Sequence, residues 1–278
     1  MKRLVQKIFR RLGFEIRRRA ATPGVESGPE RGSLEGSLEQ AREAGIVPAT
    51  VVDVGAAFGS FSRSCHAVFP RARYLMIEPL EEYVPSLEAV VKEIPGASYE
   101  IAVAGAEERC VRFNVHDDLV GSSLYRECEQ GTDVNGVQRE VRSITLDRLV
   151  LEQKVSPPYL LKIDVQGAEL DVLAGGQTTL CGADLVILEV SLFQFFEDGP
   201  MLYEVVAYMH SRGFVAYDIL GLQYRPLDHA LSQIDIVFVK EHGPLRKFHY
   251  SASPDQRREQ NRQFRAHFST LLSHERTR

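Results

Sequence analysis

The sequence predicts an α/β fold in which a mostly parallel sheet carries helices on both faces. From residue 50 onward, short β-branched runs alternate with helical stretches, and this alternation is typical of parallel strands joined by crossover helices. Several of the runs are apolar almost throughout, as strands covered on both faces tend to be. A glycine-rich turn follows the first run, at the place where open α/β sheets bind ligands.

The expected elements follow from the spacing of apolar residues along the chain. Strands are predicted at residues 50–54, 73–78, 98–104, 159–165, 184–190, 214–220 and 234–240. Helices are predicted at residues 61–69, 84–94, 168–175 and 201–213. Residues 105–147 break the rhythm, because they add two strand-like runs around a polar loop. This segment is therefore predicted to be an insertion, and its loop 117–137 is a candidate lid.

Composition divides the chain into three parts. Residues 1–32 form a basic arm and linker, residues 33–243 form the main domain, and residues 244–278 form a basic helical tail. The formal net charge of −5 combines basic ends with an acidic middle. A dedicated nucleic-acid binder normally carries its basic surface on the domain itself, so we expect no nucleic-acid partner.

The basic arm has two interpretations. Its apolar residues Leu4, Val5, Ile8, Phe9 and Leu12 fall at helical spacing, and Lys and Arg fill the other face. Such a helix either docks on the domain or stays solvated, or it lies on an anionic membrane surface. The arm has no apolar core of the kind found in a secretory signal, and no run reaches the roughly 18 residues needed to cross a membrane. We expect a cytoplasmic protein, with peripheral contact at the inner membrane surface as the sharper alternative.

No metal site is predicted. The four cysteines are scattered without a CxxC pair, so they signal neither a zinc site nor a disulfide framework. His116, Asp117 and Asp118 are adjacent, and three consecutive residues of a strand cannot all converge on one ion.

The first turn, VVDVGAAFGSF, carries the clearest chemical signal. Its spacing places Asp53, Gly55 and Gly59 in a DxGxxxG pattern, which is neither GxGxxG nor the phosphate-binding GxxxxGK[ST]. An aspartate there would repel a pyrophosphate but would suit an ammonium group. Glu78 ends the next strand nineteen residues after Gly59 and can accept hydrogen bonds from ribose hydroxyls. A ligand with a ribose at one end and an amino acid at the other, such as S-adenosylmethionine, fits both acids. The alternative is a tight turn without a ligand.

Longer motifs make a family resemblance visible. VVDVGAAFGSFS and YLMIEPLEEY are followed by VRSITLDRL, LLKIDVQGAELDVLAGG, the long run from DLVILEV to RGF, and LSQIDIVFVK. Over roughly residues 45–240 the chain resembles the FkbM family of S-adenosylmethionine-dependent methyltransferases. The resemblance implies a Rossmann-like, seven-stranded methyltransferase sheet whose last strand is antiparallel.

The resemblance also implies site residues. The loop of Asp53, Gly55, Ala56 and Gly59 corresponds to the methionine side of the cofactor site. Further residues implied at the S-adenosylmethionine site are Glu78 and Pro79 by the ribose, Ala102 by the adenine and Asp164 by the transferable methyl. This chain has Gln166 where many members have glutamate in a DVEG motif.

A hydroxyl acceptor needs a general base within hydrogen-bond reach. Asp164 is the first candidate because a strand-end carboxylate faces the crevice, although it could equally be a structural acid of the turn before Gly167. His229, in the loop before the last strand, is the second candidate. Glu169 is expected to cap or position, Asp171 to be solvated, and Glu189 either to contact substrate or to pair with a backbone N–H.

The sequence therefore predicts an O-methyltransferase that uses S-adenosylmethionine on a hydroxyl of a saccharide, glycolipid or secondary metabolite. The expected partner is a small-molecule or glycan acceptor. A domain that binds the cofactor without turnover is the first alternative, because an intact first motif predicts binding and not transfer. A nicotinamide-dependent oxidoreductase is the second, and the absent GxGxxG together with Asp53 counts against it.

Overall fold

The computed structural model describes residue 30 and residues 32–129 and 132–275 of the chain. The predicted basic arm lies outside the described residues, apart from the end of its linker. No helix in the described part is long and apolar enough to cross a membrane.

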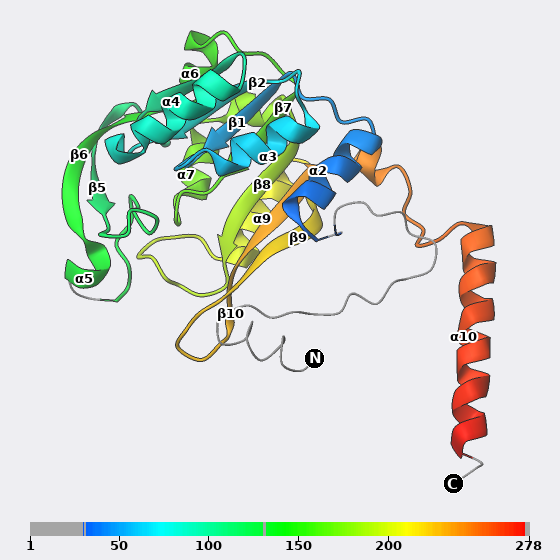
Figure 1. The fold of residues 1–278 in the computed structure, drawn as a ribbon. Helices are drawn as coiled ribbons and strands as arrows, with labels where there is room; N and C mark the ends of the chain where they lie inside the picture. The colour runs from blue at the N-terminus through cyan, green and yellow to red at the C-terminus, as the bar shows by residue number, and fades with distance from the viewer. Residues whose placement is uncertain (1–29, 31, 130–131, 276–278) are drawn as a thin grey trace, which may run out of the picture.

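A seven-stranded sheet forms the centre of the domain (Figure 1). Its strand order is β3-β2-β1-β7-β8-β10-β9, and β10 alone runs antiparallel to its neighbours β8 and β9. The strands are β1 (Thr50–Val54), β2 (Arg73–Glu78), β3 (Ala97–Ile101), β7 (Tyr159–Ile163), β8 (Ala183–Ser191), β9 (Phe214–Tyr224) and β10 (Leu231–Lys240). The predicted fold class, with seven strands and an antiparallel last strand, is confirmed.

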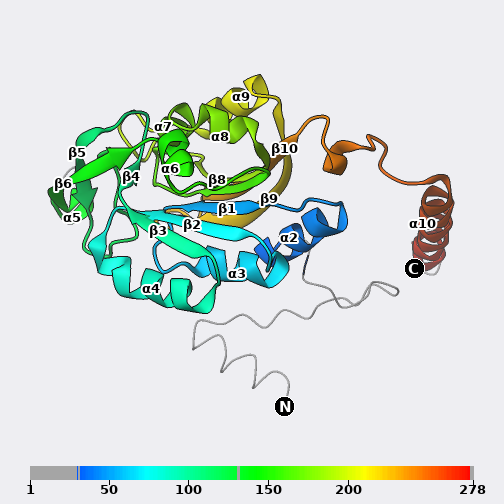
Figure 2. The same cartoon turned by 90° about the horizontal axis from the view of Figure 1, so that it is seen from above.

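Helices cover both faces of this sheet (Figure 2). One face carries α2 (Leu34–Glu43), α3 (Ser60–Val68), the turn η1 (Glu81–Tyr83) and α4 (Val84–Glu93). The other face carries α6 (Leu146–Glu152), α7 (Glu169–Ala174), α8 (Gln177–Cys181) and α9 (Leu202–Ser211). Successive β1 residues point to opposite faces, so Val51 packs in the cluster of α2 to α4 and Val52 in the cluster of α6 to α9.

The insertion forms a second, smaller sheet. Strand β4 (Val103–Ala104) leaves the end of β3 and pairs with β6 (Val137–Ile144), which also pairs with β5 (Arg109–Val115). The single strand predicted at residues 98–104 is therefore two strands in two sheets. Helix α5 (Thr132–Asn135) precedes β6. The loop after β5 folds back, and Asn114 and Ser123 exchange backbone hydrogen bonds of 2.9 and 3.0 Å.

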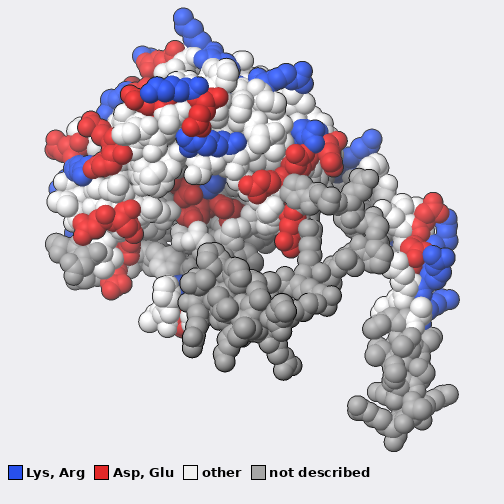
Figure 3. Space-filling view, in the orientation of Figure 1, with Lys and Arg blue, Asp and Glu red and all other residues white. Residues whose placement is uncertain are grey.

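The C-terminal tail contains the turn η2 (Pro244–Arg246) and the helix α10 (Pro254–Glu275). Helix α10 stands away from the sheet in both views (Figures 1 and 2). Basic and acidic side chains are interspersed over the visible part of the described surface (Figure 3).

The turn after β1 lies directly against the turn after β7. Gly55 and Ala56 donate backbone hydrogen bonds to the Ile77 carbonyl of β2, and Asp164 N donates to the Val54 carbonyl at 3.0 Å. Gly55 has a φ of +77°, and a Cβ at this position would lie 1.8 Å from the carbonyl oxygen of Asp164. Glycine is therefore required here by contact between two backbones, in addition to its left-handed conformation.

We expect Gly55→Ala to destabilise the fold more than a glycine substitution of equal backbone strain. Gly213 is the matched control, because its φ is +81° and a Cβ added there would meet no atom within 4 Å. Gly213→Ala should reduce the free energy of unfolding by about 1–2 kcal/mol, the cost of the left-handed conformation. Gly55→Ala should reduce it by about 1–3 kcal/mol more than Gly213→Ala does, because the backbone must shift to make room for the Cβ. Urea denaturation measures both, and equal losses would contradict the account.

Candidate functional site

A cavity of about 420 Å³ opens at the carboxyl ends of the central strands. In parallel sheets these ends meet at one edge, where α/β proteins bind ligands. The small sheet and its loop close the cavity from the side. The polar and turn residues that line it are Gly55, Ala57, Glu78, Pro79, Asp118, Gly121, Ser122, Asp164, Gln166, Glu189, Gln223 and Gln233.

Glu78 occupies one end of this cavity. Its two carboxylate oxygens accept backbone N–H groups from Ala57 at 2.9 Å and from Leu80 at 3.0 Å. Burial raises the pKa of Glu78 to about 7, although these two hydrogen bonds oppose the rise. A carboxylate has about four acceptor positions, so two remain for hydroxyl donors. The geometry suits the recognition of a diol.

Apolar residues surround the Glu78 end. Pro79 and Ala102, which the resemblance implies at the ribose and the adenine, both line the cavity, and Ala102 is buried and donates its N–H to the Glu78 carbonyl. The remaining walls come from Ile77, Leu80, Tyr83, Val103, Phe113, Leu119, Val120 and Leu124. The faces of a flat aromatic ring such as adenine could stack against these apolar walls.

Asp53 has a different partner from the one expected. Its carboxylate is buried and accepts the hydroxyl of Ser62 at 2.7 Å, which ties β1 to helix α3. Burial raises the pKa of Asp53 to about 6 and the Ser62 hydrogen bond lowers it. Asp53 does not line the cavity, so its predicted contact with an ammonium group is not part of this geometry.

Ala56 and Gly59 also lie outside the cavity lining. Gly59 begins helix α3 with a φ of +71°, and a Cβ there would lie 2.6 Å from Cγ2 of Val90 in α4. Of the predicted residues Gly55, Ala56 and Gly59, Gly55 lines the cavity. Ala57, which was not predicted, also lines it and donates its N–H to Glu78. The glycine spacing therefore reflects packing of the turn and of α3 on α4.

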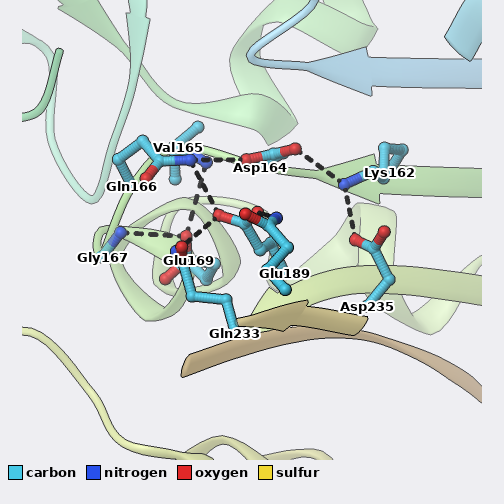
Figure 4. Close-up of polar contacts among 10 residues, drawn as sticks. Lys162, Asp164, Val165, Gln166, Gly167, Glu169, Glu189, Gln233 and Asp235 are labelled. Carbon is cyan, nitrogen blue, oxygen red and sulfur yellow. Dashed lines mark hydrogen bonds and ion pairs between the residues drawn. The ribbon is translucent and has the colours of Figure 1, made fainter. Parts of the chain in front are cut away.

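Asp164 lines the cavity and is held in an ion-pair cluster (Figure 4). Lys162 Nζ lies 3.0 Å from Asp164 Oδ2 and 3.0 Å from Asp235 Oδ1. Burial lowers the pKa of Lys162, but the two carboxylates outweigh it and raise that pKa above its ordinary value. Lys162 is thus a buried cation, and Gln166 Nε2 binds the other oxygen of Asp164 at 3.0 Å.

Glu189 is surrounded by glutamines. Its Oε2 accepts Nε2 of Gln166 at 2.7 Å and of Gln233 at 3.0 Å, and its Oε1 accepts Nε2 of Gln223 at 2.7 Å. Three of these four residues are drawn and labelled in Figure 4. Burial and then the Asp164 charge raise the pKa of Glu189 to about 8, although Lys162 opposes the rise. Glu189 is expected either to contact substrate or to pair with a backbone N–H. The three hydrogen bonds from these glutamines come from side-chain amides and not from a backbone N–H.

Two acids of α7 hold the neighbouring loops. Glu169 is buried and accepts the N–H groups of Gly167 at 3.1 Å and Val165 at 3.4 Å, which matches the expected capping role. Burial raises its pKa to about 7. Asp171 accepts the hydroxyl of Tyr125 at 2.6 Å, so it ties the insertion to α7 instead of being simply solvated.

His229 lies apart from these groups. It is exposed in the turn between β9 and β10 and does not line the cavity. This geometry does not favour the predicted role of His229 as a base. Among the described residues no group of His, Cys, Asp or Glu is arranged to hold a metal.

The insertion contributes one wall of the cavity. Residues of its loop, from Asp118 to Leu124, line the cavity, and Ser123 donates its hydroxyl to the Gln166 carbonyl at 2.6 Å. The Phe-rich segment after β8 supports this loop, because Phe195 O accepts Cys128 N at 2.7 Å. The predicted lid segment and the segment after β8 therefore contact each other beside the site.

Sequence reasoning missed Lys162, Gln223, Gln233 and Asp235 as members of this cluster. A usable signal was present: Lys162 and Asp235 interrupt strands that are otherwise apolar. A charge buried in a sheet needs an opposite charge nearby, and a Lys–Asp pair satisfies that need even though β8 lies between β7 and β10. Gln223 and Gln233 carry no comparable signal, because their strand ends are polar.

We expect Lys162→Met to reduce stability through unpaired carboxylates. Removing one partner of a buried pair costs about 3–5 kcal/mol, and the lower end applies because the Asp164 and Asp235 side chains are 33% and 27% exposed. Asp235→Asn is the control, because Lys162 still pairs with Asp164 in this variant. This substitution should lower the free energy of unfolding by about 1–2 kcal/mol. Urea denaturation gives both values. A Lys162→Met protein as stable as the wild type would contradict the assignment.

Comparisons with known proteins identify a family for this chain. The Methyltransferase FkbM domain model matches residues 53–216, more than half of the 278 residues. No curated protein matches the sequence. A similar solved structure is an FkbM methyltransferase from Methylobacillus flagellatus KT, 18% identical with a TM-score of 0.44; the match covers 68% of this chain and 43% of that one, so this chain spans less than half of its length.

Two further solved structures are similar at the same level. Magnesium protoporphyrin IX methyltransferase from Synechocystis PCC 6803, with bound SAM, is 10% identical with a TM-score of 0.40, covering 74% of this chain and 76% of that one. The 1,6-didemethyltoxoflavin-N1-methyltransferase of Burkholderia thailandensis is 12% identical, with a TM-score of 0.40 and the same two coverages. The family model, which spans the first turn, Glu78 and the Asp164 motif, is what assigns the protein: the chain belongs to the FkbM methyltransferase family.

Proposed function

We propose that this methyltransferase transfers the methyl group of S-adenosylmethionine to a hydroxyl of a saccharide, glycolipid or related secondary metabolite. The observation that carries the proposal is a single cavity lined both by Glu78 of β2 and by Glu189 of β8, two strands that β1 and β7 separate in the sheet. One end has Glu78 among apolar walls, and the other has carboxylates and glutamine amides.

The Glu78 end fits a nucleoside. Glu78 would accept the ribose hydroxyls, the apolar wall with Ala102 would cover the adenine, and the turn of Gly55 to Ala57 would border the amino-acid portion. When bound, S-adenosylmethionine supplies an electrophilic methyl group on a sulfonium. The protein's own contribution is to hold donor and acceptor in close contact and to exclude water.

The opposite end fits a polyhydroxylated acceptor. Gln166, Gln223 and Gln233 bring amide groups, and Asp164 and Glu189 bring carboxylates, to one side of the cavity. Amides and carboxylates together offer donors and acceptors, which is what sugar hydroxyls require because each hydroxyl both donates and accepts. This composition favours a saccharide over an apolar acceptor.

A glycolipid acceptor is the narrower form of the proposal. It is motivated by the basic arm, in which residues 1–19 hold eight Lys or Arg against one acid. An amphipathic basic helix would bring the enzyme to an anionic membrane surface where lipid-linked glycans reside. Flotation with anionic vesicles tests it, since equal recovery of full-length and arm-deleted protein would remove the glycolipid form.

The alternatives differ in what they bind and convert. A nicotinamide-dependent enzyme would bind NADH, and a cofactor-binding module would bind S-adenosylmethionine without methylating any acceptor. A carboxylate such as Glu78 can bind the ribose of either cofactor, so it does not distinguish between them. The first turn does, because it lacks the GxGxxG pattern of nicotinamide-dependent enzymes.

We expect the wild type to bind S-adenosylmethionine and S-adenosylhomocysteine in calorimetric titrations, and not NADH. Glu78→Gln should weaken both affinities about tenfold or more, because a hydrogen bond to a charged group contributes about 1.5–3 kcal/mol. The control is Glu82→Gln, an acid on η1 that pairs with Arg139 and does not line the cavity. Unchanged affinity in Glu78→Gln would sink the assignment of the ribose end, and binding of NADH alone would favour the oxidoreductase.

A further inference from the structure

We propose that Glu189 is the general base that removes the proton from the acceptor hydroxyl, and that Gln166, Gln223 and Gln233 hold its carboxylate in place for this role. The inference rests on the proposed O-methyltransferase function and deepens it, because it moves the proton acceptor from Asp164 to a residue of the neighbouring strand.

The position of Glu189 supports this role. It lies near the end of β8, is 6% exposed, and lines the same cavity as Glu78 and Asp164. Its three amide partners come from three segments: the turn after β7, the end of β9, and β10. A carboxylate fixed by three segments has little freedom to rotate away from an acceptor.

Counting hydrogen-bond positions shows where a hydroxyl can bind. A carboxylate offers about four acceptor positions, two on each oxygen. Gln166 and Gln233 occupy both positions on Oε2, and Gln223 occupies one on Oε1. Within the described part of the chain, one position on Oε1 is left for a donor from the cavity. The amides are donors at these contacts, so they favour the ionised form that a base requires.

Asp164 is already engaged by a cation. Its Oδ2 lies 3.0 Å from the Lys162 ammonium, and its Oδ1 accepts Gln166 at 3.0 Å. At this distance the ammonium and the carboxylate form an ion pair, so Asp164 serves to balance the buried Lys162 charge. The Lys162 pair makes Asp164 a fixed negative charge beside the site, one that suits an adjacent positive sulfonium.

The charges that face Glu189 act in the opposite direction. Asp164 and Asp235 are carboxylates on the neighbouring β7 turn and β10, and Glu169 faces it from α7; Lys162 is the opposing cation. Burial and the nearby acids raise the pKa of Glu189 to about 8. A base whose pKa lies near the working pH combines a useful ionised fraction with a strong affinity for the transferred proton.

The proposed step balances as follows. The acceptor hydroxyl gives its proton to Glu189 Oε1, and its oxygen lone pair forms the new C–O bond to the methyl carbon. The C–S bond breaks and its electron pair stays on sulfur, which becomes a neutral thioether. Glu189 then returns to the carboxylate by releasing the proton to solvent.

The test combines a titration with an activity profile. Protein labelled with ¹³C at the glutamate side-chain carboxyl is titrated by NMR, and Glu189→Gln identifies the Glu189 resonance. We expect a midpoint near 8, well above the ordinary 4.5. A midpoint near 4.5 would overturn the proposal, whatever the activity data show.

Activity is measured as S-adenosylhomocysteine formation with a panel of methyl hexopyranosides. In the wild type kcat/KM should rise with pH to a plateau with a midpoint near 8, because the ionised form is the base. Glu189→Gln should lower kcat about 100-fold or more and abolish this inflection, while its calorimetric affinity for S-adenosylhomocysteine stays within about threefold of the wild type. A Glu189→Gln enzyme that keeps its rate and its inflection would refute the role of Glu189.

Glu169→Gln is the matched control. It removes another buried carboxyl of raised pKa, but one that binds backbone N–H groups and does not line the cavity. Whatever its effect on rate, the inflection near 8 should remain; its loss in Glu169→Gln and not in Glu189→Gln would overturn the assignment. If the protein binds S-adenosylhomocysteine but methylates no glycoside, the saccharide proposal fails, and a Glu189 midpoint near 4.5 would still separately overturn the base role.

Discussion

Contact between two backbone turns fixes the position of the site. The turn after β1 packs so closely on the turn after β7 that a Cβ at Gly55 would lie 1.8 Å from the Asp164 carbonyl oxygen. Helices α3 and α7, which follow these turns, cover opposite faces of the sheet (Figure 2). The chain therefore diverges at this point and leaves a crevice at the strand ends, which the insertion closes from one side. Both ends of the cavity depend on this divergence.

The cavity differs chemically along its length because each of its carboxylates has a different kind of hydrogen-bond or ion-pair partner. Glu78 is satisfied by two backbone N–H groups, Asp164 by the Lys162 ammonium, and Glu189 by three side-chain amides. A cation stabilises charge more strongly than neutral donors do, so these acids lie in different electrostatic environments. Separating acids by environment in this way lets one site hold a fixed charge and a proton acceptor side by side.

Much of the architecture could be predicted from the sequence, because apolar alternation and the FkbM motifs indicate seven strands with an antiparallel last strand and single out Glu78. The side-chain partners could not be predicted in the same way. Asp53 follows the same motif as its family counterparts but bonds to Ser62. Gln223 and Gln233 reach Glu189 only because antiparallel β10 brings two distant strand ends beside β8. Such contacts depend on register, and periodicity alone does not set register.

The most direct test of the central claim is a crystal structure of the full-length protein with S-adenosylhomocysteine. We expect the ribose hydroxyls on the Glu78 carboxylate, the adenine against Ala102, and the sulfur on the side of the cavity that holds Asp164 and Glu189. A ligand bound outside this cavity, or bound in it with the ribose away from Glu78, would contradict the account.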